Sequence, residues 1–211
     1  MEEALEATSA FFTLDPMVSN RLAPTFDALS GGDWSNLISN DEELKLRLES
    51  QGVDSPEKQD SISWDDANLF FLSCIHLTSI GRPMPLEAGL SRERFGRFPY
   101  GDGSAITYLR DWIRDSQRKP DTLEELADLM EKLATRMSGT SMETGFGRLE
   151  MLGWLTSDEV TTLRKALTSK CWMPSADEPL DGGCQDAAKH LVALLRAAEK
   201  RSCGVVLRVH N

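Results

Sequence analysis

The chain of 211 residues is 40% hydrophobic and 27% charged, which is typical of a globular protein with a core that needs no metal or disulfide. Its net charge of −11 argues against a general nucleic-acid binder, because such proteins hold phosphates through clustered lysines and arginines. No apolar run approaches the roughly 20 residues that cross a bilayer, so no membrane segment is predicted.

The first predicted elements are a strand and two helices. Residues 9–14 form an apolar, aromatic run that Asp15 and Pro16 end, which favours a strand. A short helix is predicted around residues 25–29. A longer helix is predicted over residues 41–50, with Asn40 as its cap and acidic residues in its first turn, where they favour the helix dipole.

The most apolar segment predicts a helix at the centre of the core. It opens at Ser63, continues to Ile80 with apolar residues at most positions, and ends at Gly81. Cys74 and His76 both fall on this helix. Residues two apart point to different sides of a helix and share no ligand site, so we interpret both as core or edge residues.

The middle of the chain alternates loops with helices. The stretch 82–103, rich in proline and glycine, is the longest irregular segment. Helices are predicted over residues 104–119, 122–137 and 156–167, and a short turn of helix over residues 143–153. Thr122 and Thr156 each precede a glutamate by three residues, which is the pattern of a capping box.

The C-terminal stretch predicts an amphipathic helix that ends in a strand. Apolar residues recur every three or four positions from Gln185, and Gly204 precedes the β-branched run Val205 to Val209. A lone strand leaves its backbone groups unpaired, and residues 9–14 are its natural partner. The predicted fold is α+β and mostly helical, one domain over residues 1–211 with six or seven helices and a small sheet that pairs the N- and C-terminal strands.

No motif indicates catalysis, a cofactor or a metal. The four cysteines lack the close pairs of a zinc site, and we expect reduced thiols, with Cys74 in the core. Nucleophile-elbow, HExxH, Walker and GxGxxG patterns are missing from the sequence. The carboxylate pairs at residues 41–43 and 65–66 are interpreted as helix starts. We therefore predict no catalytic residue, no metal ligand and no cofactor.

The strongest functional signal is a loop that mixes arginines with aromatic residues. Such mixtures are typical of binding sites, because guanidinium groups stack as well as pair. The alternative is structural: the aromatic side chains pack the loop on the core, and the arginines pair with the chain's own carboxylates. The predicted ligand- or partner-binding residues are Arg92, Arg94, Phe95, Arg97, Phe98 and Tyr100 in the loop, and Arg110 and Arg114 on the helix that follows.

Charge is distributed unevenly along the chain. Residues 1–60 carry 13 acidic and 4 basic side chains, whereas residues 82–119 carry 8 basic and 5 acidic side chains. This asymmetry is compatible with two solvated faces. An acidic surface also fits a basic protein partner, and neither nucleic acid nor a membrane is expected as a partner.

Three segments resemble a known kind of domain. They are the strand Ala10-Phe-Phe-Thr-Leu-Asp, the segment Gly153-Trp-Leu-Thr-Ser-Asp-Glu-Val that opens a helix, and the closing helix with Gly204-Val-Val-Leu-Arg-Val. Together they resemble small uncharacterised bacterial α+β domains of the YfbM-like kind. The likeness covers scattered pieces of both ends, about a quarter of the chain. The resemblance implies a fold and brings no established reaction.

Two functions of different classes remain open at this point. The first is a bacterial protein-interaction protein of the immunity type, which neutralises a toxin. The second is a small-molecule- or anion-binding protein or enzyme, with a pocket under the loop 92–104. The acidic start Met1-Glu-Glu-Ala is unlike a secretory signal, so a cytoplasmic location is expected.

Overall fold

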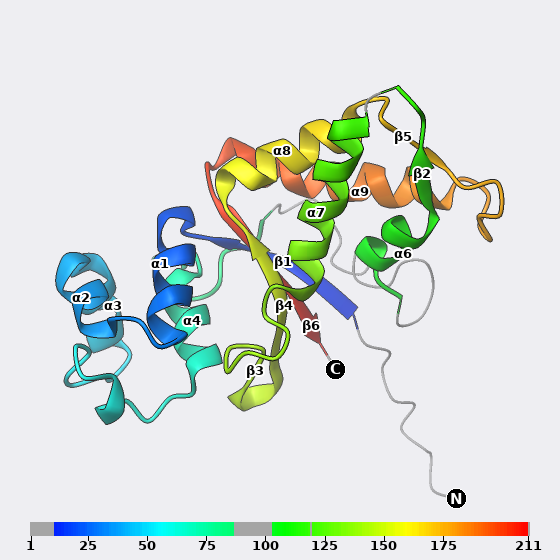
Figure 1. Ribbon diagram of the computed structural model, residues 1–211. Helices are drawn as coiled ribbons and strands as arrows, with labels where there is room; N and C mark the ends of the chain where they lie inside the picture. The colour runs from blue at the N-terminus through cyan, green and yellow to red at the C-terminus, as the bar shows by residue number, and fades with distance from the viewer. Residues whose placement is uncertain (1–10, 87–102, 119, 211) are drawn as a thin grey trace, which may run out of the picture.

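An antiparallel sheet that joins the two ends of the chain runs through the middle of the molecule (Figure 1). The computed structural model describes residues 11–86, 103–118 and 120–210. β1 (Phe11–Met17) pairs along its whole length with β6 (Gly204–His210), from Phe11 opposite His210 to Met17 opposite Gly204. The predicted pairing of the N- and C-terminal strands is confirmed.

The sheet is larger than the sequence indicated. β4 (Leu149–Leu155) pairs with the other side of β6, and the short β3 (Thr144–Gly145) follows, giving the order β1-β6-β4-β3. The predicted short turn of helix over residues 143–153 is confirmed only at the 3-10 turn Phe146–Arg148, and the strands β3 and β4 occupy most of the segment. β4 is buried on both faces, so it lacks the alternation that marks a half-exposed strand, and its glycine resembles a helix interruption.

Gly153 is required by close packing between β4 and a helix. A Cβ atom at this position would overlap the backbone carbonyl oxygens of Lys132 and Leu133, on α7 (Pro120–Thr135). The strand also carries a register shift between Met151 and Gly153. The glycine therefore allows the backbone of the helix to approach the sheet.

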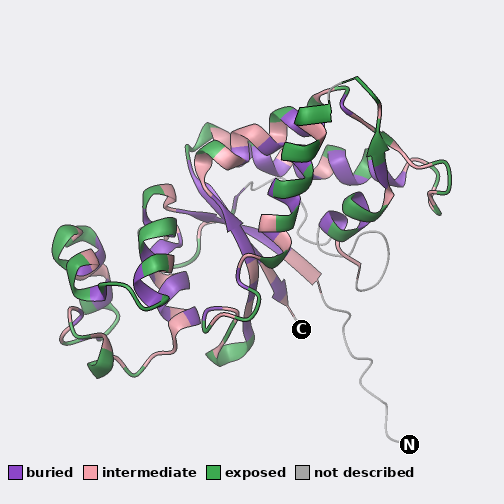
Figure 2. Cartoon of the chain, in the orientation of Figure 1, coloured by how far each residue is buried: buried purple, intermediate pink, exposed green. Residues whose placement is uncertain are grey.

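Helices cover both faces of the sheet and enclose two hydrophobic cores (Figures 1 and 2). Val206 belongs to one core, whereas Val205 and Leu207 belong to the other, because successive side chains of a strand point to opposite faces. The first core lies against α1 (Ser19–Leu29), α2 (Trp34–Asn40), α3 (Glu42–Ser50) and α4 (Asp66–Cys74). The second lies against α6 (Ala105–Trp112), α7, α8 (Ser157–Thr168) and α9 (Gly183–Lys200).

The described residues contain eight α-helices, so the α+β, mostly helical fold is confirmed with more helices than the six or seven predicted. The unpredicted helix is α2, whose N-cap Asp33 accepts a hydrogen bond from the backbone N–H of Asn36. Two short 3-10 helices, Gln59–Ser61 and Phe146–Arg148, complete the helical segments. None of the helices in these ranges is both long and apolar enough to cross a membrane.

The second half of the fold contains a small sheet that the sequence did not indicate. β2 (Ile113–Asp115) pairs with β5 (Trp172–Pro174). The capping box of Thr156 is confirmed. That of Thr122 is wrong, because α7 already begins at Pro120, in the first turn where proline is tolerated.

The core helix α4 is shorter than predicted. It ends at Cys74 instead of Ile80, and Ile75 continues in an extended conformation. Arg47 of α3 donates hydrogen bonds to the carbonyl oxygens of Leu72 (3.2 Å) and Ile75 (2.8 Å), which occupies acceptors at the end of the helix. A side chain distant in the sequence thus contributes to the helix end.

Alanine at Gly153 should destabilise the protein by about 3 kcal/mol, because the new methyl group forces β4 away from α7. Urea unfolding measures this loss. Gly139 is the control: its φ is +73° and nothing lies within 4 Å of an added Cβ, so alanine there should cost only about 1 kcal/mol of backbone strain. Equal losses at the two positions would contradict the packing argument.

Candidate functional site

The structure describes two of the eight predicted binding residues, Arg110 and Arg114. The other six, Arg92, Arg94, Phe95, Arg97, Phe98 and Tyr100, lie outside the described residues. Arg110 is on α6, and its guanidinium forms an ion pair with Glu131 of α7. The prediction that Arg114 continues this helix is wrong, because α6 ends at Trp112.

Arg114 instead lies in β2, where its side chain serves the local backbone. Its Nη1 donates hydrogen bonds to the carbonyl oxygens of Asp111 (2.6 Å) and Ile113 (2.8 Å). Arg110 and Arg114 therefore do not lie on one helix. The β-branched Ile113 faces Pro174 across the small sheet, a pairing that no local helical pattern reveals.

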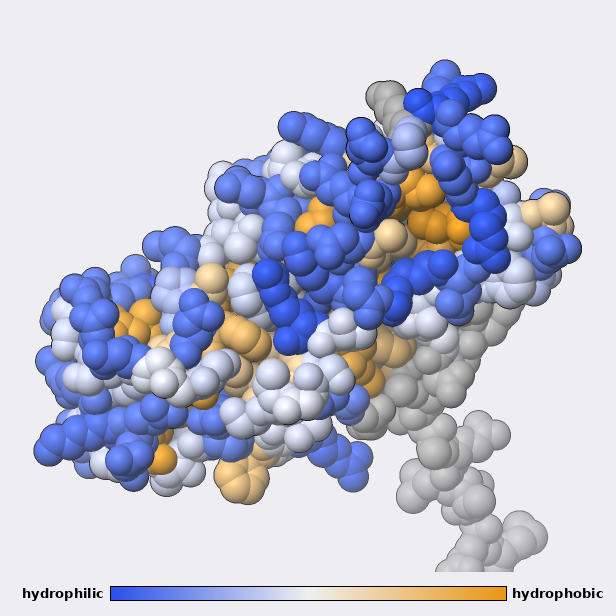
Figure 3. Space-filling view, in the orientation of Figure 1, coloured by the Kyte–Doolittle hydropathy of each residue, from blue (hydrophilic) through white to orange (hydrophobic). Residues whose placement is uncertain are grey.

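The acidic part of the sequence forms a distinct half of the fold. Residues 19–74, which contain α1 to α4, carry 11 acidic and 4 basic side chains, a net charge of −7 out of −11. In Figure 3 this part of the molecule lies at the left, and its visible surface is mainly hydrophilic. Most of the net negative charge is thus carried by the part of the fold that contains α1 to α4.

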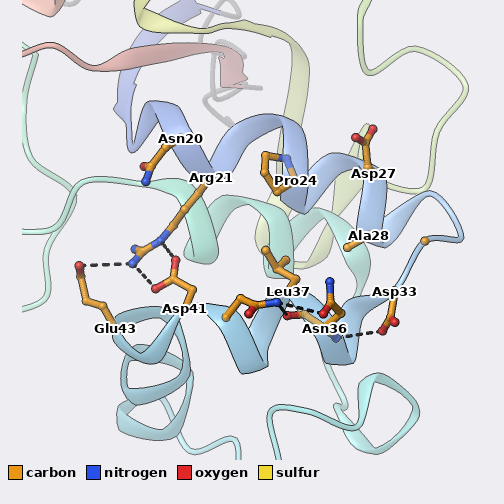
Figure 4. Close-up of a pocket in the computed structure, with 12 residues that line it drawn as sticks. Asn20, Arg21, Pro24, Asp27, Ala28, Asp33, Asn36, Leu37, Asp41 and Glu43 are labelled. Atoms are coloured by element: carbon orange, nitrogen blue, oxygen red, sulfur yellow. Dashed lines mark hydrogen bonds and ion pairs between the residues drawn. The ribbon is translucent and has the colours of Figure 1, made fainter.

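A cavity of about 640 Å³ opens within this half, beside α1, α2 and the start of α3 (Figure 4). Arg21, Asp41 and Glu43 lie at one end of the view, and Asp27 and Asp33 lie at the other. Carboxylates and side-chain amides dominate the lining. The lining residues are Asn20, Arg21, Pro24, Asp27, Ala28, Gly32, Asp33, Asn36, Leu37, Asn40, Asp41 and Glu43.

Arg21 is buried at one end of the cavity and is held by two carboxylates. Only 4% of the residue is exposed. Its Nε and Nη2 donate to the two oxygens of Asp41, at 2.5 and 2.8 Å, and Nη2 lies 3.3 Å from a carboxylate oxygen of Glu43. Such a two-pronged contact is the strongest geometry an arginine makes with a carboxylate.

The pair shifts both pKa values in the direction that keeps the two groups charged. Burial by itself lowers the pKa of Arg21, but hydrogen bonding and charge attraction to Asp41 outweigh it and raise the pKa. Burial likewise tends to raise the pKa of Asp41. The guanidinium of Arg21 and the backbone N–H of Leu44 outweigh that tendency and lower it.

Asp41 has two roles, only one of which the sequence indicated. It caps α3 by accepting a hydrogen bond from the Leu44 N–H at 2.9 Å, so the predicted helix start is confirmed, with Asp41 instead of Asn40 as the cap. Its second role, neutralising Arg21, was missed. A signal existed, since Arg21 is the only basic residue among the first 44, which contain nine acidic residues.

Asp27, Asp33 and Glu43 are exposed carboxylates of the cavity, and Glu43 also lies within ion-pair distance of Arg21 and Arg47. Glu43 is largely exposed, with 77% of its side chain accessible. Asp33 accepts the capping N–H of Asn36, and Asp27 forms no ion pair within the described ranges. Asn36 and Asn40 hydrogen-bond to each other at 2.9 Å. The cavity therefore offers hydrogen-bond acceptors with negative charge, which suit a cationic group.

The cysteines and the potential metal ligands of the described residues are dispersed or buried. Within 11–86, 103–118 and 120–210, no three His, Cys, Asp or Glu side chains group as metal ligands do. All four cysteines are free and buried, and Cys74 lies in the core as predicted. Burial raises the pKa of the Cys74 and Cys184 thiols to about 12, so neither is a thiolate at neutral pH.

Asparagine at position 41 should destabilise the protein by about 3 kcal/mol, because Arg21 stays buried and charged without its partner. Asp33→Asn is the matched control. It also changes the N-cap of a helix but removes no arginine partner, and should cost under about 1 kcal/mol.

Unfolding measured across pH tests the same pair. The pKa of Asp41 is lowered by folding, so its stabilisation is complete above about pH 4 and is lost as the pH falls through the folded-state pKa. The stability difference between wild type and Asp41→Asn should shrink accordingly in acid. A difference independent of pH would contradict the assignment.

Comparisons with known proteins add no relative. No protein-family model matches the chain, and neither the curated proteins nor the solved structures contain a match. The resemblance to YfbM-like domains therefore stays a prediction, and the argument for function depends on the geometry of the molecule alone.

Proposed function

We propose that the chain is a cytoplasmic bacterial protein that binds a basic protein partner, as an immunity protein binds the toxin that it neutralises. The observation that carries the proposal is the carboxylate-lined cavity in the acidic half. Lysine or arginine side chains of the partner enter this cavity, one pairing with Glu43 at one end and another with Asp33 at the other end.

The acidic half attracts a basic partner both through ion pairs in the cavity and through its net charge at longer range. A single exposed ion pair contributes only up to about 1 kcal/mol, so one carboxylate does not define a binding site. Several carboxylates distributed along one concave surface together attract more than one basic side chain of the partner. The net charge of −7 on residues 19–74 also steers a basic partner toward this end and accelerates association at low ionic strength.

Arg21 and Asp41 form the fixed floor of the proposed interface. Because they neutralise each other, they contribute rigidity more than net charge. Glu43 bridges toward two arginines, with its oxygens 3.3 Å from Arg21 and 3.6 Å from Arg47, which positions its carboxylate at the cavity. The partner's basic side chain thus meets a Glu43 carboxylate that two arginines hold in position.

The alternative proposal places a small-molecule or anion site beneath the loop 92–104. The described residues give it less support, since Arg110 pairs with Glu131 and Arg114 bonds to backbone carbonyl oxygens. Both arginines are thereby engaged within the chain, as the structural interpretation of the loop anticipates.

Removal of two cavity charges should weaken binding of a lysine- and arginine-rich decapeptide. The double variant Asp33→Asn/Glu43→Gln should raise the dissociation constant about fivefold or more, which corresponds to a loss of about 1 kcal/mol. Isothermal titration calorimetry at low salt measures the change. A glutamate-rich decapeptide should show no binding.

The control variant is Asp181→Asn/Glu125→Gln, which makes the same change of charge at exposed positions of the other half. It should leave the dissociation constant within about twofold of the wild type. Equal weakening by both double variants would mean that net charge alone attracts the peptide, and would contradict a site in the cavity.

The immunity role requires its own experiment. Cross-linking and pull-down from the native lysate should recover a partner with wild type and with the control variant, and less of it with Asp33→Asn/Glu43→Gln. That partner should inhibit growth when expressed alone, and co-expression of the chain should restore growth. A partner without toxicity would leave the interaction but refute the immunity role.

A further inference from the structure

A second polar cluster lies on the opposite side of the first core, where β1 and β6 pair. Asp15, only 3% exposed, accepts a hydrogen bond from Nε of Arg208 at 2.7 Å and another from the Thr13 hydroxyl at 3.1 Å. The Thr13 hydroxyl also lies 2.9 Å from Nε2 of His210. Because that hydroxyl gives its single proton to Asp15, Nε2 of His210 carries the proton of the second bond.

These contacts fix the side chains of Arg208 and His210 at the end of β6. The ring of His210 stacks on Phe11, with centroids 4.4 Å apart, and the guanidinium of Arg208 lies over the ring of Phe71 at 4.9 Å. Arg208 keeps 18% of its side chain exposed, and Nε is the atom that binds Asp15. Buried partners thus hold Arg208 in one orientation while part of its side chain faces outward.

A groove of about 390 Å³ opens beside this cluster, and side chains from three separate segments line it. Asn68 and Phe71 come from α4, Phe146 and Arg148 come from the turn before β4, and Arg208 and His210 come from β6. More than 50 residues of sequence lie between each of these segments and the next. Their convergence combines two arginines and a histidine with apolar walls.

The turn that presents Arg148 adopts a costly conformation. Gly147 and Arg148 have φ angles of +71° and +61°, a region that residues with a Cβ seldom occupy. Asp65 holds the turn in place by accepting the Phe146 N–H at 3.0 Å, and the Asn68 side-chain amide donates to the Phe146 carbonyl oxygen at 3.3 Å. The strain is thus maintained by contacts with α4.

This turn leaves an aromatic ring and a guanidinium at the surface. Phe146 is 74% exposed, the largest exposed fraction among the large hydrophobic residues that the structure describes. Arg148 is exposed and forms no ion pair within the described ranges. Both oxygens of Asp65 bond to amide groups of Asn68 and Phe146, so this carboxylate is already engaged.

We propose that the groove binds a small molecule that carries one anionic group, a carboxylate or a phosphate, on an apolar or aromatic body. Arg148 and the exposed part of Arg208 receive the anion, because guanidinium groups match the oxygens of both kinds of anion. Phe71 and Phe146 contact the body of the ligand. This site is separate from the acidic cavity and takes a ligand of opposite charge.

Calorimetry with defined probes tests the site. Phenyl phosphate and phenylacetate should bind, and the tighter of the two distinguishes phosphate from carboxylate. Inorganic phosphate should bind more weakly than phenyl phosphate, since it lacks the apolar body, and benzylamine should not bind. Absence of binding by both aromatic anions at millimolar concentration, or equal binding of benzylamine, would overturn the proposal.

Variants assign the binding to the groove. Arg148→Ala should weaken the tighter aromatic anion about tenfold or more, the loss typical of one charge-assisted contact, and Phe146→Ala should weaken it less. Arg196→Ala removes an exposed arginine of α9 outside the groove and should change the affinity less than twofold.

The folded state of each variant is checked by urea unfolding. In the wild type, NMR titration should move the backbone amide signals of Gly147 and Arg148. Equal weakening by Arg148→Ala and Arg196→Ala, or unmoved amide signals at the turn, would show nonspecific attraction and refute the site.

Discussion

The pairing of β6 with β1 on one side and β4 on the other is the interaction on which the rest of the fold depends. β6 is buried almost completely, and its side chains alternate between two hydrophobic cores. Each core is closed by four helices, and β6 contributes side chains to both of them. A central strand saturates all its backbone groups, which explains why an apolar segment near the end of the chain is stable in the interior.

The same strand carries the residues that link folding to the groove. Val205 to Leu207 are apolar, whereas Arg208 and His210 contact the polar residues of β1. Asp15 and Thr13 are buried polar groups, and burial of such groups is tolerated only when hydrogen bonds satisfy them. The polar end of the β1–β6 pair thus depends on mutual hydrogen bonding, while its other end depends on apolar packing.

Two arginine–aspartate pairs, each with one buried member, support two surfaces of opposite character. Arg21 with Asp41 lies at the acidic cavity, and Arg208 with Asp15 lies at the groove. In each pair, the hydrogen bonds from the arginine to the aspartate hold the guanidinium in one orientation. The proposed interaction with a basic partner and the proposed anion site use different groups, so either stands without the other.

Much of the local structure followed from residue patterns, because those patterns depend on near neighbours. The amphipathic helix before Gly204, the pairing of the terminal strands and the capping box at Thr156 are all confirmed. The charge of residues 1–60 also indicated an acidic surface. The predicted arginine–aromatic loop lies outside the described residues, and only Arg110 and Arg114 of that set were placed.

The remaining features were decided by contacts between distant segments. Gly153 permits β4 to approach α7, and Arg47 occupies the carbonyl groups where α4 ends. The burial of Arg21 against Asp41 arises only when α1 and α3 come together. By itself, the sequence determined the periodic helices, the terminal strands and the distribution of charge. Only the tertiary structure decided the sheet order, the end of α4 and both cavities, because these depend on groups that meet through space.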